Sequence, residues 1–81
     1  MNTEEAKKLI ASTLQQVAPE IKSDQLDYES TFRSQVDLDS YDFYNFLSRL
    51  EKTTGVKISE AEIREIKTLS QLVVFILKKS H

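Results

Sequence analysis

Residues that reverse a chain are almost missing from this sequence, which has one glycine, Gly55, and one proline, Pro19, in 81 residues. A sheet needs turn residues at each reversal, so this chain is poorly suited to strands and turns. A chain of this length buries roughly 60 to 65% of the surface that it exposes when unfolded. We therefore predict that residues 1–81 form a single all-α domain around a small core.

The first predicted helix covers residues 3–17, where apolar residues recur at helical spacing. Glu4 and Glu5 lie in its first turn, where the helix dipole favours negative charge, and Pro19 stops it. The connection 18–38 is polar and unusually long, and we predict an ordered loop laid over the core. Its spaced apolar anchors are Ile21, Leu26, Tyr28, Phe32, Val36 and Leu38.

The second helix is expected to begin at Asp39 or Ser40 and to end near Gly55, a natural C-terminal cap. Asp39 can cap the first turn, and Asp42 adds negative charge there. Turning each residue by about 100° separates two faces of this helix. The core stripe is Phe43, Phe46, Leu47 and Leu50, and the opposite face is Tyr41, Asn45, Ser48 and Lys52, with Tyr44 between the two.

Two more helices are predicted, and each has a capping signal at its N-terminus. The sequence SEAE at 59–62 is a capping box, which predicts a short helix with Ile63 and Ile66 inward. Thr68 and Gln71 repeat the signal before a last helix. The inward stripe of that helix is Leu69, Leu72, Val73 and Ile76. The predicted fold is a four-helix bundle with a short third helix and a long loop between the first two helices.

The composition argues against several functions. The chain has no cysteine, and its one histidine is His81, so neither a Ser-His-Asp nor a Cys-His arrangement can form. For Asp37, Asp39 and Asp42 a solvated or capping role is favoured over a metal site. The net charge of -2 and the scattered basic residues disfavour nucleic acid.

Membrane and secretory signals are not found in the sequence either. The longest apolar run, 72–77, is far shorter than the roughly 20 residues that a membrane helix needs. The first residues lack the hydrophobic stretch of a secretory signal. We expect a soluble, cytoplasmic monomer.

Ser40 stands where the second helix begins, and unpaired amides and the dipole favour an anionic group at such a position. A phosphate ester there would be stabilised. Taken alone, a serine at a helix start more often serves as a cap. The residues around it decide between these two interpretations.

These residues resemble the acyl carrier protein family over nearly the whole chain: a first amphipathic helix, a long loop ending TFRSQVDLDSYDFYNFLSRLE, the link GVKIS, and EIREIKTLSQLVVFI. The centre of the resemblance is Asp39-Ser40, followed by Tyr41 and Asp42. It implies that Ser40 carries 4'-phosphopantetheine, covalently attached from coenzyme A by a phosphopantetheinyl transferase, and that Asp39 is the acid preceding the attachment site. It also implies a non-catalytic carrier that presents an acyl thioester to loading, synthase or acyltransferase enzymes of fatty-acid, polyketide or related biosynthesis.

The sequence departs from the common family pattern. Val36, Asp37 and Leu38 replace the usual residues before the serine, and Tyr41 replaces leucine or methionine after it. Residues 39–66 hold six acids and four bases, a weakly acidic surface. We therefore expect a specialised, discrete carrier whose docking depends more on tyrosines than on charge. The predicted docking residues are Tyr41, Asp42, Tyr44, Asn45, Glu51 and Glu60.

Two alternatives stay open. An unmodified helical interaction module would explain the tyrosines and the mild charge equally well. A peptidyl or aminoacyl carrier would share the attachment chemistry but hold a different cargo.

Overall fold

The computed structural model describes residues 1–36 and 38–79, except for the side chains of Arg33 and Glu60. The described chain is helical, and its extended pairing is limited to one isolated bridge between Thr31 and Thr68. Four helices form the predicted bundle: α1 (Thr3–Val17), α3 (Ser40–Thr54), the short α4 (Glu60–Glu65) and α5 (Leu69–Lys79). The all-α fold class is confirmed.

The helix ends follow the local signals in the sequence. Asp39 caps α3, and Gly55 ends it in the left-handed conformation with φ 74°. Ser59 and Glu62 form the reciprocal capping box of α4. Gln71 donates its amide to the Thr68 hydroxyl at the start of α5. These ends are determined locally, because each cap satisfies backbone groups that the helix itself leaves unpaired.

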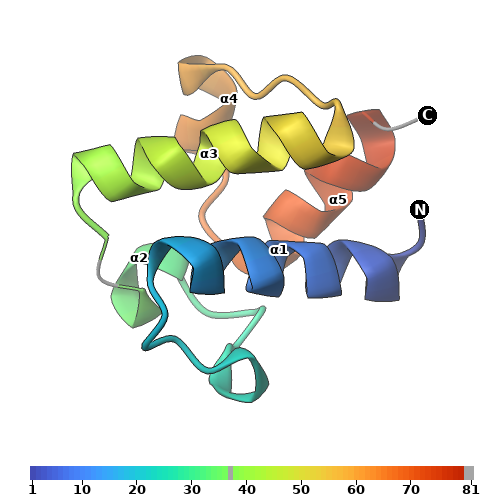
Figure 1. Cartoon of the computed structure of the whole chain (residues 1–81). Helices are drawn as coiled ribbons and strands as arrows, with labels where there is room; N and C mark the ends of the chain where they lie inside the picture. The colour runs from blue at the N-terminus through green and yellow to red at the C-terminus, as the bar shows by residue number, and fades with distance from the viewer. Residues whose placement is uncertain (37, 80–81) are drawn as a thin grey trace.

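The helices α1 and α3 run in opposite directions side by side, and α5 packs against α1 (Figure 1). The core lies between them. Phe46 and Leu50 of α3 are completely buried, as the predicted stripe requires. The buried cluster is Ala6, Ile10, Leu14, Phe32, Val36, Phe46, Leu50, Val56, Ile58, Leu69, Leu72, Val73 and Ile76.

The long connection is ordered and contains two short helical turns, η1 (Ser23–Gln25) and α2 (Phe32–Gln35). The sequence pattern did not predict these turns. Backbone bonds join the loop to the α4–α5 link and to α5: the Phe32 amide donates to the Lys67 carbonyl at 2.7 Å, and the Ser70 amide donates to the Tyr28 carbonyl at 2.9 Å. The predicted anchors of the loop all lie in the core or pack against it. The predicted loop over the core is confirmed.

Within the described residues, no helix is both long enough and apolar enough to cross a membrane.

Candidate functional site

The candidate site is the N-terminus of α3. Asp39 is the cap, and its Oδ1 accepts a hydrogen bond from the amide of Asp42 at 2.8 Å. Ser40 is the first residue of the helix, and its side chain is exposed. The capping role that a serine often has at such a position therefore belongs to its neighbour.

An apolar cavity of about 440 Å³ opens beside Ser40. We call it the serine cavity; it is lined by Phe32, Val36, Leu38, Asp39, Ser40, Phe43, Tyr44, Leu47 and Ile63. Ser40 and Tyr44 both line it, because residues four apart lie on the same side of a helix. A group attached to the serine would be accessible to solvent while lying next to apolar surface.

These features fit a covalent phosphopantetheine arm. The hydroxyl that would form the ester is exposed, and the helix terminus behind it favours a phosphate group. The carboxylates of Asp39 and Asp42 lie in the same turn and partly offset that preference. The arm's terminal thiol is a group that this chain lacks, because the sequence contains no cysteine.

Comparison with known proteins shows the family of the chain. Residues 7–76 match the family described as phosphopantetheine attachment site. The chain is also 33% identical to the acyl carrier protein of Treponema denticola over 69 residues, which are 85% of this chain and 82% of that protein.

The chain belongs to the phosphopantetheine-attachment family of carrier domains. Proteins of this family are non-catalytic carriers, and their cofactor is covalently attached 4'-phosphopantetheine. Among the described residues, no group of three or more histidine, cysteine or acidic side chains is placed so that it could hold a metal ion.

The predicted docking residues of the carrier fall into two groups. Tyr41 and Tyr44 are 79% and 68% exposed, the largest exposed apolar side chains on α3. Asp42 and Asn45 are half-buried. Helical spacing indicated which way these side chains point, but not how far their neighbours cover them.

Glu51 of the carrier has a structural contact that the sequence did not indicate. Its Oε1 accepts a hydrogen bond from the amide of Ile58 at 2.9 Å, which joins α3 to the link before α4. The side chain of Glu60, also predicted to dock, lies outside the described residues, as do Asp37 and His81.

The structure also shows an aromatic cluster that the sequence pattern treated only as core. The ring of Phe32 lies 5.8 Å from that of Phe43 and 5.8 Å from that of Phe46, measured between centroids. Phe32 lies on α2 and the other two on α3, so no local spacing brings them together. Phe32 and Phe43 form part of the wall of the serine cavity.

Proposed function

We propose that this protein is an acyl carrier protein in which Ser40 bears the 4'-phosphopantetheine arm. One observation carries the assignment to Ser40: the serine is exposed at the start of α3, while Asp39 makes the capping hydrogen bond. The serine is therefore available for modification without loss of the cap. The acyl carrier protein of Treponema denticola, to which the chain is similar, supports acyl groups as the cargo.

The arm would supply a thiol that holds the acyl group as a thioester. The chain itself provides a fixed origin for that arm, because α3 is held in place by the buried side chains of Phe46 and Leu50. When Ser40 is modified, its hydroxyl loses the proton, its oxygen forms the phosphoester bond, and the adenosine bisphosphate part of coenzyme A leaves. Tethering raises the effective concentration of cargo at each partner, so weak docking is sufficient.

We infer that docking centres on Tyr41 and Tyr44, which extend from the helix that carries Ser40. Asp42, Asn45, Glu51 and Glu60 complete the proposed surface. Exposed ion pairs contribute little each, so the tyrosines would provide most of the contact. The proposed partners are a phosphopantetheinyl transferase and loading, synthase or acyltransferase enzymes of fatty-acid, polyketide or related biosynthesis. We further propose that residues 1–81 act as one monomeric domain in the cytoplasm.

The assignment is tested by incubating the protein with coenzyme A, magnesium and a broad-specificity transferase, then measuring its intact mass. We expect the mass of the wild-type protein to rise by one phosphopantetheine. The same rise is expected for Ser12→Ala, which removes another exposed serine. The mass of Ser40→Ala should not change. An unchanged mass of the wild-type protein with several transferases would favour the unmodified interaction module, and modification of Ser40→Ala would move the attachment site elsewhere.

Modification alone does not distinguish an acyl from a peptidyl or aminoacyl carrier. The loaded protein should therefore be offered to an acyltransferase with an acyl donor and to an adenylating enzyme with amino acids. Transfer of the acyl group supports the proposal, and exclusive transfer of an amino acid contradicts it.

A further inference from the structure

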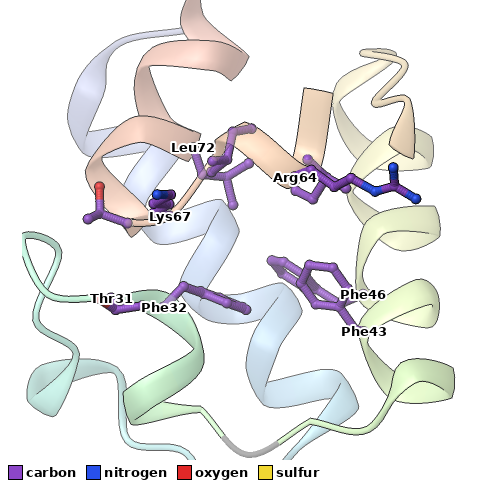
Figure 2. A pocket seen from close by; sticks show the side chains of 10 residues that line it. Thr31, Phe32, Phe43, Phe46, Arg64, Lys67 and Leu72 are labelled. Carbon is purple, nitrogen blue, oxygen red and sulfur yellow. The ribbon is translucent and has the colours of Figure 1, made fainter. Parts of the chain in front are cut away.

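The face of α3 opposite the core stripe contains a single charged residue, Lys52. Figure 2 shows the core side of the helix, where Phe43 and Phe46 point toward Phe32 of α2. Turning each residue by about 100° places four residues in one row on the other side. We call them the outward row: Tyr41, Asn45, Ser48 and Lys52. A partner that docks along α3 therefore meets one charge in this row, and it is positive.

The other charged side chains of α3 lie away from the outward row. Asp42 is half-buried, about a quarter-turn from the row. Arg49 donates from Nη1 to the side-chain oxygen of Gln16 on α1 at 3.1 Å. Glu51 accepts the amide of Ile58, in the link before α4, at 2.9 Å. Arg49 and Glu51 are thus held by neighbouring parts of the fold, to either side of the row.

Lys52 is exposed, and it has no ion-pair partner among the described side chains. An α-helix rises 1.5 Å per residue, so Lys52 lies about 18 Å along the axis from Ser40. The first turn of the helix has the acids Asp39 and Asp42. The helix therefore presents negative charge near Ser40 and positive charge at its far end, which distinguishes the two ends of the docking face.

We propose that Lys52 is a specificity-determining residue for the enzymes that load or receive the cargo. It selects partners whose docking face carries a carboxylate about 18 Å from the point where the arm enters. A partner with a basic side chain at that place is disfavoured, because like charges brought together across an interface repel.

This role concerns the choice and orientation of the partner more than the strength of binding, because one exposed ion pair contributes little affinity. The contact area would still come from Tyr41 and Tyr44, which are far more exposed than the residues of the core stripe. The inference rests on the proposed function of Ser40, since the distance to the carboxylate is counted from the arm.

The test compares two acyltransferases of known structure. The acidic-face enzyme has carboxylates about 18 Å from its active-site entrance, and the basic-face enzyme has lysine or arginine there. Each is offered protein that carries the arm, as shown by intact mass. At about 25 mM salt, the wild type should be loaded with the higher kcat/KM by the acidic-face enzyme, and about 300 mM salt should remove most of this preference. With that enzyme, Lys52→Gln should lower kcat/KM about two- to fivefold, mainly through KM, and Lys52→Glu about tenfold.

Lys8 provides the matched control. It is exposed on α1, where it borders Ser23 and Asp24 of η1 rather than α3. Lys8→Glu makes the same change in net charge and should leave kcat/KM unchanged with both enzymes. A cation in the last turn also suits the helix dipole, so Lys52 has a structural role as well. If that role alone mattered, Lys52→Glu would be loaded less well by both enzymes, and salt would not change the ratio between them.

The decisive result is a reversal of preference. Lys52→Glu should be loaded faster than the wild type by the basic-face enzyme, which a loss of stability cannot produce. Equal kcat/KM of wild type and Lys52→Glu with the acidic-face enzyme would overturn the proposal. So would preference of the wild type for the basic-face enzyme, or no loading by the acidic-face enzyme. If coenzyme A and the transferase add no arm, the proposed function fails instead, and the intact mass distinguishes that failure from this one.

Discussion

The cap at Asp39 allows the folding role of this residue to be measured separately from any role in modification. In Asp39→Ala the 2.8 Å hydrogen bond from the Asp42 amide is lost, together with a negative charge at the helix N-terminus. Loss of an N-cap costs about 1 kcal/mol. The backbone bond from the Phe43 amide to the Asp39 carbonyl, at 2.9 Å, remains, so α3 should fray only at its first turn.

Asp39→Asn is the matched variant, because its side-chain oxygen can still accept the hydrogen bond while its charge is gone. We expect it to lose only a few tenths of a kcal/mol, the lower range for a charge at a helix end. In a domain of this size, 1 kcal/mol corresponds to about 4–8 °C in melting temperature. Urea and thermal unfolding followed by far-UV circular dichroism measure both variants.

The reasoning is refuted if Asp39→Ala is as stable as the wild type, or if Asp39→Asn loses as much as Asp39→Ala. The same proteins then go into the mass assay. We expect Asp39→Asn to keep most of its stability and to be modified more slowly at Ser40, because the carboxylate would contribute to recognition. Unchanged modification of Asp39→Asn would limit this residue to its capping role.

Three further predictions follow from other positions. Tyr41→Ala and Tyr44→Ala should each change the free energy of unfolding by less than about 0.5 kcal/mol, as exposed side chains do, yet slow acyl transfer to a partner; a large loss of stability with normal transfer would contradict their docking role. Gly55→Ala should cost about 1–2 kcal/mol in urea unfolding and Gly55→Asn less, because the residue has φ 74°; equal stability of both with wild type would argue against this backbone strain. Hydrogen bonds from Ser59 lower the pKa of Glu62 below its ordinary value of 4.5, so its contribution to stability is present above that pH and is lost as the pH falls through the lowered pKa. The melting temperature of Glu62→Gln should therefore fall less than that of the wild type as the pH is lowered. If the two proteins have the same dependence of melting temperature on pH, the stabilising role of the Glu62 carboxylate is contradicted.

The agreement between sequence and fold is best where local chemistry decides the outcome. The predicted first helix, 3–17, has the bounds of α1, and α3 begins and ends where Asp39 and Gly55 indicated. Caps, a left-handed glycine and apolar spacing act within one or two turns of chain, so they can be recognised without knowing the fold.

The same local signals do not predict the turn of α2. Its four residues are too few for a stable isolated helix, and the amide of Phe32 is bonded to the carbonyl of Lys67, which is distant in the sequence. Likewise, the hydrogen bond from Ile58 to Glu51 occurs only once the link after α3 has turned back.

Some features of the candidate site follow from the local sequence, and others depend on how the helices pack. By itself, the sequence determined that Ser40 begins a helix, that Asp39 can cap it, and that Tyr41 lies away from the core stripe, because all three depend on spacing along one helix. The tertiary structure decided that an apolar cavity opens beside Ser40 and that Phe32 from α2 meets Phe43 from α3 in its wall. Cavities form where side chains of different helices meet, and which side chains meet there depends on how the helices pack.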